Sequence, residues 1–227
     1  MTTEAAFPSI LDSHDGDATV STATRIFDLW SAQATPFSVF ALRPDAAATA
    51  RIAAVRQSLT DAGIGHVIPS EFLHVTVQSL GNLGEGGLTG QIADELGAAV
   101  TGALAECAPF SVVLGAVNTF HGAAFIEVHE ASDGAPLHAM QRAVVDALVA
   151  ANWVPVRHPE RPYVPHLSIC YYDRDYSVRQ VADALSSHRS ETFGSLRVDA
   201  IELVRIVGNG TPYPPMETVR RIPLGGA

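Results

Sequence analysis

The amino-acid sequence predicts an α+β protein with two lobes, a pseudo-twofold pair of mainly antiparallel sheets flanked by helices, and a central cleft. Strand and helix patterns are interspersed along the chain, and several neighbouring strands are joined by links too short for a parallel crossover. The segments LHVTVQ (73–78) and PHLSIC (165–170) repeat one pattern of histidine, apolar, small hydroxyl and apolar residues. The second copy follows the first by 92 residues at both the histidine and the hydroxyl position, which indicates a loose internal duplication.

The elements of the first half are predicted from hydrophobic periodicity and from residues that begin or end helices. We expect a helix at 22–34, a strand at 36–44, a helix at 45–63, a strand at 72–81 and a helix at 89–106. Asp45 at the start of the Ala-rich helix and Gly63 past its end are residues typical of helix termini. The strand at 72–81 carries the first motif and ends in a glycine-rich turn.

The second half continues with a hairpin and the second motif. We expect strands at 110–120 and 123–131, a helix at 135–153, a strand at 165–173, a helix at 177–189 and strands at 196–208 and 216–224. His121 and Gly122 form the link of the predicted hairpin, and Pro136 suits the first turn of a helix. Residues 1–20 are expected to form a poorly ordered acidic tail, and 21–227 a single two-lobed domain.

Composition limits the partners that the protein is expected to have. Of 227 residues, 47% are hydrophobic and 17% are charged, which predicts a soluble domain with a sizeable core. No stretch approaches the roughly 18 apolar residues of a membrane span, and the acidic N-terminus does not resemble a secretory signal, so a cytoplasmic location is expected.

The formal net charge of −10, with no lysine, argues against broad nucleic-acid binding. A small anionic substrate held by local arginines remains open, and these arginines are Arg157, Arg161, Arg174 and Arg179. Oligomeric state is not predicted.

Strand alternation gives each motif one polar side. Side chains two residues apart share a face of a strand, so His74, Thr76 and Gln78 are predicted to point one way. By the same rule, the shared face of the second motif holds His166, Ser168 and Cys170. Two such strands side by side would line one cleft with two imidazoles and two hydroxyls. We interpret Cys107 and Cys170 as reduced, partly buried thiols.

This set of side chains suits phosphoryl chemistry without a metal. A neutral histidine can take a proton from water while a second, protonated histidine gives one to the leaving oxygen. With an ordinary pKa of about 6.5, histidine provides both forms near neutral pH. Hydroxyls such as Thr76 and Ser168 can donate hydrogen bonds to non-bridging phosphate oxygens. A buried structural histidine is the usual explanation of a single copy, but two matching copies favour a functional pair.

The two motifs resemble those of the 2H phosphoesterase superfamily, which includes 2′-5′ RNA ligase-like proteins and cyclic phosphodiesterases. The resemblance includes RPYVPHLSI at 161–169, LHVTVQSLGNL at 73–83 and the closing strands VDAIELVRIVG and YPPMETVRRIPL, and it extends from about residue 37 to 224. It implies a bilobal α+β fold and metal-independent cleavage of 2′,3′-cyclic phosphates or 2′-5′ phosphodiester bonds in nucleotides or RNA ends. It also implies that His74 and His166 are the acid–base pair and that Thr76 and Ser168 hold the phosphate. Which histidine is the acid stays open.

Several further residues are candidates for substrate binding or for other sites. Many members of the superfamily have a basic residue just after the second motif, whereas Tyr171 and Tyr172 follow it here and Arg174 is the next cation. The substrate-binding candidates are Tyr163, Arg161, Gln78, Tyr172 and Phe40. His121 and His129 could meet across the hairpin, but without a third ligand they do not predict a zinc site. No cofactor or metal is predicted. The alternative to an enzyme is a non-catalytic module that binds nucleotides or RNA ends.

Overall fold

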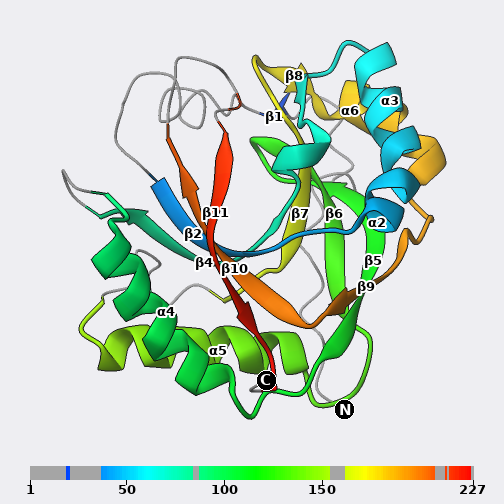
Figure 1. Ribbon diagram of the computed structural model, residues 1–227. Coiled ribbons are helices and arrows are strands. Elements are labelled where there is room, and N and C mark those ends of the chain that lie inside the picture. Colours follow the sequence, from blue (N-terminus) through cyan, green and yellow to red (C-terminus); the bar gives the residue numbers. More distant parts are fainter. Residues whose placement is uncertain are drawn as a thin grey trace.

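The computed structural model describes residues 19–20, 37–83, 87–153, 162–207, 213 and 215–225 (Figure 1). The predicted helix at 22–34 and residues 1–18 of the predicted tail lie outside the described residues. Thr19–Val20 forms the short strand β1, which pairs antiparallel with β8 (Tyr176–Ser177). In the described parts of the chain, no helix is long and apolar enough to cross a membrane.

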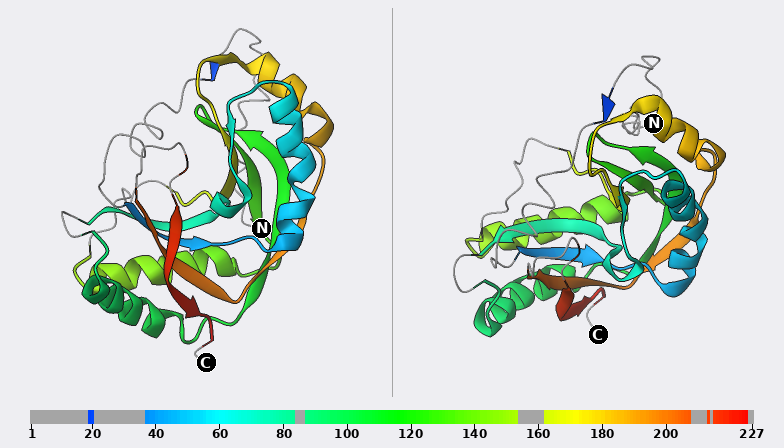
Figure 2. Two further views of the ribbon diagram at one scale, coloured as in Figure 1. Left: turned by 45° about the horizontal axis from the view of Figure 1, so that its top comes forward. Right: turned by 90° about the horizontal axis from the view of Figure 1, so that it is seen from above.

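The strands of the described residues form two antiparallel halves that meet at the two motif strands (Figures 1 and 2). The first half has the order β11 (Met216–Pro223), β10 (Ala200–Ile206), β2 (Phe37–Leu42) and β4 (Val75–Asn82). The second half continues with β7 (His166–Tyr171), β6 (Ala123–Glu130), β5 (Phe110–Thr119) and β9 (Gly194–Val198), and β3 (His66–Val67) also pairs with β7. Within the described residues, β4 and β7 are joined at one pair, Val75 with Leu167. The predicted two-lobed antiparallel architecture is confirmed.

Helices cover the outer side of each half. The α-helices among the described residues are α2 (Ala46–Arg51), α3 (Ala53–Asp61), α4 (Gly90–Leu104), α5 (Pro136–Ala150) and α6 (Val178–Leu185). Two short 3-10 helices are η2 (Ser70–Phe72) and η3 (Ser186–His188). α4 and α5 pack on the first half, at the bottom of Figure 1, and α2, α3 and α6 pack on the second, at its right. The continuous apolar core lies between these helices and the sheet. A smaller apolar cluster lies on the other, concave side of the first half and consists of Val39, Ala41, Val204, Ile206 and Met216.

Local signals explain where these helices begin and end. The Asp45 carboxylate accepts a hydrogen bond from Ala48 N at 2.6 Å and caps α2. The Thr89 hydroxyl caps α4, and Ser177 with Gln180 forms a capping box at the start of α6. Gly63, with φ of +63°, reverses the chain after α3 because glycine adopts this left-handed conformation without steric cost.

Two predicted elements are divided in the structure. The helix expected at 45–63 is two helices, α2 and α3, which are separated at Ile52. The single strand expected at 196–208 is two strands, β9 and β10, which are separated at Asp199. β9 pairs with β5 in the second half, whereas β10 pairs with β2 and β11 in the first. The prediction was wrong because the apolar alternation continues through Asp199, although the chain passes there from one half to the other.

Candidate active site

The two motifs lie at the seam where the halves of the sheet meet. Val75 and Leu167, the residues directly after the two histidines, are paired across β4 and β7 and are fully buried. Their neighbours therefore point to the opposite, concave side. Because the pairing is antiparallel, His74 lies toward Ser168 and Thr76 toward His166. The structure thus brings the four predicted motif side chains together, in a pseudo-twofold arrangement.

The two imidazole rings are held in the same way. His74 Nδ1 lies 2.8 Å from the carbonyl oxygen of Phe72, and His166 Nδ1 lies 2.8 Å from that of Val164. A carbonyl oxygen can only accept a hydrogen bond, so Nδ1 is the protonated nitrogen of each ring. In the neutral ring this tautomer leaves the lone pair on Nε2. Each histidine is therefore oriented by the carbonyl two residues before it, and Nε2 is the nitrogen available for a further contact.

His74 has an environment that favours its neutral form. The pKa of His74 is lowered to about 4, mainly by burial and to a smaller extent by the positive charges of Arg43 and His166, although the hydrogen bond to the Phe72 carbonyl acts in the opposite direction. An imidazole with a pKa of about 4 is unprotonated at neutral pH. His74 is consequently suited to accept a proton.

Both motif strands contain a bulge three residues after the histidine. In β4 the register with β2 skips Val77, and in β7 the register with β6 skips Ile169. Because each bulge adds one residue to its strand, the side chains beyond it point to the opposite face from the one that simple alternation predicts. Gln78 pairs with Phe40 on the core side of the sheet, and its side chain is 1% exposed. Cys170 is fully buried, with Sγ 3.3 Å from the Ile64 carbonyl. The prediction that Gln78 and Cys170 share the polar faces of the motifs was therefore wrong.

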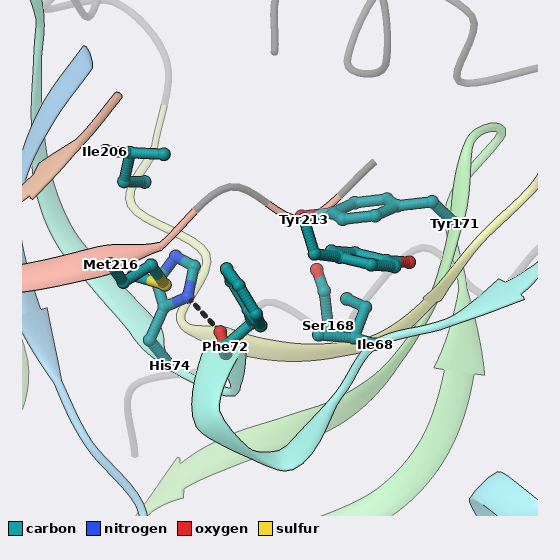
Figure 3. Close-up of a pocket in the computed structure, with 8 residues that line it drawn as sticks. All are labelled: Ile68, Phe72, His74, Ser168, Tyr171, Ile206, Tyr213 and Met216. Atoms are coloured by element: carbon teal, nitrogen blue, oxygen red, sulfur yellow. Dashed lines mark hydrogen bonds between the residues drawn. The ribbon is translucent and has the colours of Figure 1, made fainter. Parts of the chain in front are cut away.

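The bulge in β7 instead turns Tyr171 toward Ser168. Ile68, Phe72, His74, Ser168, Tyr171, Ile206, Tyr213 and Met216 line one pocket (Figure 3). Burial raises the pKa of Tyr171 to about 12, although a hydrogen bond with Ser168 acts against this shift. Phe72 and Tyr213 pack with ring centroids 5.5 Å apart. The pocket beside His74 and Ser168 thus has aromatic and aliphatic walls, and its tyrosines are neutral at pH 7.

The side chains around His166 come from the β5–β6 hairpin. Phe120 and Phe125 stack on each other with centroids 4.0 Å apart, and both meet the His166 ring edge-on, at 4.9 and 5.6 Å. Glu127 lies directly across from His166 in the β6–β7 register. The sequence interpretation missed all three residues. Only strand alternation in β6 could have found Phe125 and Glu127, because it places them on one face.

Glu127 is the carboxylate of a hydrogen-bonded group beside His166. It accepts a hydrogen bond from Asn118 Nδ2 at 2.7 Å and contacts His129 Nε2 at 2.9 Å. Burial tends to raise the pKa of Glu127, but the hydrogen bonds with His129 and Asn118 outweigh it, so the pKa is lowered. Glu127 is therefore ionised at neutral pH. His129, considered above as a zinc ligand, is engaged by this carboxylate, whereas His121 is exposed in the turn.

The predicted substrate-binding residues have different positions. The half-buried Tyr163 donates a hydrogen bond from its hydroxyl to the Thr76 carbonyl at 3.1 Å, which keeps it beside the first motif. Phe40 and Tyr172 are fully buried in the core, and the Tyr172 hydroxyl bonds to that of Thr119. Gln78 is buried as described above. We leave Phe40, Tyr172 and Gln78 out of the proposed site because a ligand in the cleft has no access to them.

The predicted arginine cluster is not gathered at the pocket in the part of the chain that the structure describes. Arg157 and Arg161 lie outside the described residues. Arg174 stacks over the Tyr176 ring at 5.0 Å and is bonded to the Gly63 carbonyl. Arg179 is exposed on α6. Arg43, which the sequence interpretation did not single out, is the arginine whose charge acts on His74.

Comparisons with known proteins agree with this fold. A family model described as the 2′-5′ RNA ligase superfamily matches residues 33–210. LigT of E. coli has a similar structure, with a TM-score of 0.60 and 14% identity over 83% of this chain and 97% of LigT. TT0787 of Thermus thermophilus has a TM-score of 0.61 and 16% identity over 84% of this chain and 98% of TT0787. No curated protein sequence matches the chain significantly.

Further solved structures extend the comparison. A structure described as a phosphoesterase has a TM-score of 0.61 and 14% identity, covering 84% of this chain and 98% of its own. E. coli LigT has also been crystallised with NADP⁺, 3′-AMP, ATP or phosphate. At these identities, the structural similarities establish the fold. The family match covers most of the chain, so the protein belongs to the 2′-5′ RNA ligase superfamily, and its resemblance to the 2H phosphoesterases is confirmed.

Proposed function

We propose that this protein is a metal-independent phosphodiesterase that opens 2′,3′-cyclic phosphates or cleaves 2′-5′ phosphodiester bonds of nucleotides or RNA ends. One observation carries the proposal. Two histidines on adjacent strands are oriented by equivalent Nδ1 hydrogen bonds, and each is accompanied by a hydroxyl two residues later. Membership in a superfamily of phosphoesterases and the small nucleotides bound by E. coli LigT support the same substrate class.

The environments of the two histidines suggest their roles. His74, neutral at pH 7, takes a proton from the attacking water at Nε2. The water oxygen forms a bond to phosphorus, and the bond from phosphorus to the 2′ or 3′ ribose oxygen breaks. His166, protonated and across from the Glu127 carboxylate, gives a proton to that ribose oxygen. The product is a phosphomonoester with a free hydroxyl, and exchange with solvent restores both histidines.

The hydroxyls have a separate task. Thr76 and Ser168 lie on either side of the seam, each near the histidine of the other motif. Their hydrogen atoms are available to the non-bridging phosphate oxygens, on which negative charge concentrates during the reaction. Tyr163 keeps the backbone beside Thr76 in place through its hydrogen bond to the Thr76 carbonyl. Two proton-transfer groups and two phosphate-holding groups therefore converge on one phosphorus atom.

Turnover with single-histidine variants tests this proposal. The purified protein is incubated, with and without a chelator, with 2′,3′-cyclic nucleotides, ADP-ribose cyclic phosphate and 2′-5′ dinucleotides, and the phosphomonoester isomer is identified. We expect His74→Ala and His166→Ala each to lower kcat by about 10²- to 10⁴-fold. His66→Ala, at an exposed histidine on β3, is the matched control and should leave turnover unchanged.

Full activity in either motif variant, or loss of activity with the chelator, would contradict the mechanism. Binding without turnover by the wild-type protein would favour a non-catalytic module.

The pH dependence of kcat/KM gives an independent prediction. His74 must be unprotonated to accept a proton, so the rate should rise as the pH increases through about 4 and then level off. The rate should fall again at higher pH, where His166 loses its proton. Stopped assays in buffers of constant ionic strength measure this profile. An acidic limb centred near 6.5, the ordinary pKa of histidine, would show that His74 is not the base.

A further inference from the structure

The pocket at the seam needs a positive charge if its substrate is a phosphodiester. The motif residues that line it are Ser168, which provides a hydroxyl, and the unprotonated His74. The next residue of β7 that lines the pocket is the neutral Tyr171. His166 gives up its proton during the proposed reaction. A cation from outside the motifs is therefore required to hold the phosphate throughout the cycle.

Strand β2 brings Arg43 to this side of the sheet. Val39 and Ala41 belong to the apolar cluster on the concave side, and Ala41 pairs directly with Thr76 of the first motif. Arg43 directly follows β2, two residues beyond Ala41, and its contact with Met216 of the same cluster places its guanidinium on this side. The Arg43 side chain thus lies on the same side of the sheet as that of Thr76.

The guanidinium of Arg43 is anchored at the edge of the pocket. Nη1 donates to the Met216 sulfur at 3.3 Å, and Nη2 donates to the Glu71 carbonyl. Met216 lines the pocket together with His74, and Glu71 precedes Phe72, whose carbonyl orients the His74 ring. The positive charge of Arg43 is close enough to His74 to act on its protonation. Figure 3 shows Met216, His74 and Phe72 side by side in the pocket.

The carboxylates near Arg43 do not form ion pairs with it in the part of the chain that the structure describes. Glu71 and Glu202 both act electrostatically on Arg43, yet within the described residues neither forms an ion pair with it. Glu202 instead accepts a hydrogen bond from the Thr218 hydroxyl at 2.7 Å. A guanidinium has five N–H donors in a planar fork, and the bonds to Met216 and Glu71 leave donors for an anion.

We propose that Arg43 binds the phosphate group of the substrate and of the phosphomonoester product, as the cation that β2 contributes to the pocket of the two motif strands. The inference rests on the proposed function for the identity of the substrate. It goes beyond that function by assigning the phosphate-binding charge to a residue outside both motifs. Arg43, Thr76 and Ser168 then share the non-bridging oxygens, while His74 and His166 move the protons.

Titration with inorganic phosphate and with 3′-AMP tests this assignment without any need for turnover. The imidazole signals of His74 and His166 are followed by NMR in the wild-type protein, Arg43→Met and Arg43→Lys. We expect Arg43→Met to weaken the binding of both ligands about 10- to 100-fold and to raise KM for the substrate, because a charge-assisted hydrogen bond is lost. Arg43→Lys keeps the charge and should recover part of the affinity. Arg43→Gln gives a second neutral variant if Arg43→Met does not fold.

A matched control excludes a general effect of removing an arginine. Arg43 itself lines a second, polar pocket next to the first. Arg221 and its ion-pair partner Asp199, 2.7 Å away, line this second pocket as well. Arg221→Met should leave phosphate affinity and the His74 signals unchanged. Unchanged phosphate affinity in a folded neutral Arg43 variant, or loss of it in Arg221→Met alone, would overturn the assignment.

The pH titration of His74 provides a readout that a purely structural role of Arg43 would not move. Without the Arg43 charge, the pKa of His74 should rise, and the acidic limb of the rate profile should move to higher pH. The other titratable groups facing this region are Glu71, His166, Tyr171, Glu202 and Tyr213, and none of them is changed in the variant.

The outcomes also separate the proposed phosphodiesterase function from the assignment of Arg43. Phosphate binding that depends on Arg43 in a protein without turnover refutes the function alone, and turnover with a phosphate affinity that does not depend on Arg43 refutes the assignment alone.

Discussion

Tyr171 and Tyr172 are adjacent in the sequence but have different environments. The bulge at Ile169 turns Tyr171 into the pocket, where its hydroxyl bonds to Ser168. Tyr172 is fully buried in the core and bonds to the Thr119 hydroxyl, which also contacts the carbonyls of Phe120 and Ala123. One phenol thus belongs to the candidate site and the other to the packing of the β5–β6 hairpin.

Removing the Tyr171 hydroxyl should lower activity, whereas removing the Tyr172 hydroxyl should lower stability alone. Tyr171→Phe removes a hydrogen-bond partner of Ser168, so we expect kcat/KM to fall several-fold, with a loss in the free energy of unfolding no larger than that of Tyr172→Phe. Tyr172→Phe leaves the pocket intact but removes a buried hydrogen bond, so it should lower the free energy of unfolding by about 1–2 kcal/mol and leave kcat/KM unchanged. Urea unfolding and steady-state kinetics on both variants measure the two effects. The reverse pattern would show that Tyr172 lies in the site.

Helix α5 shows how an element far from the motifs supports them. Ala135, before the helix, has φ of 48° and provides no side-chain cap. The Glu130 carboxylate at the end of β6 takes this role, because it accepts hydrogen bonds from Leu137 N and His138 N, both at 3.1 Å. It also contacts His138 Nδ1 at 2.8 Å, and the His138 ring packs edge-on against Tyr163 at 5.4 Å. Tyr163 in turn bonds to the backbone of the first motif.

Loss of the Glu130 carboxylate should therefore weaken α5. We expect Glu130→Ala to lower the free energy of unfolding by about 1–2 kcal/mol, because two backbone N–H groups at the helix start lose their acceptor. Asp133→Ala, in the exposed loop before the same helix, is the control and should change stability by less than about 0.5 kcal/mol. Urea denaturation followed by far-UV circular dichroism measures both variants. Equal stability of the two would show that Glu130 is not the cap.

At the scale of the whole molecule, the two halves of the sheet depend on each other. The chain leaves the second half after β9 and completes the first with β10 and β11. α4 and α5, which come from the middle of the chain, cover the first half, whereas α2 and α3, from the beginning, cover the second. Neither half is a continuous segment of sequence, so neither contains a complete core of its own.

We therefore expect one cooperative unfolding transition. Hydrogen exchange of the slowest amides in β2 and in β6 should report the same free energy of opening, because global unfolding exposes both strands. Urea unfolding followed by tryptophan fluorescence and by far-UV circular dichroism should give coincident curves. Two separate transitions, or one half that remains protected while the other exchanges, would contradict this interdependence.

Much of the fold and part of the candidate site follow from local patterns. Period-two alternation places His74 with Thr76 and His166 with Ser168. The two motifs share the same spacing of histidine and hydroxyl, 92 residues apart, and this repetition predicts that they meet. Asp45 and Gly63 delimit their helical segment because capping and left-handed conformations depend on the residue itself. These features need only neighbours within a few positions along the chain, so they could be predicted before the structure was known.

The remaining features depend on which strands lie side by side. The bulges that turn Gln78 and Cys170 away and Tyr171 inward exist because β2 and β6 pair in registers that skip Val77 and Ile169. Arg43 and Phe120 come close to the motif residues only through the folded sheet, since no local pattern connects them to the motifs. The sequence by itself thus determined the repeated histidine–hydroxyl pairs, because alternation is a property of one strand. Only the tertiary structure decided which charges and rings surround them, because these come from strands that become neighbours on folding.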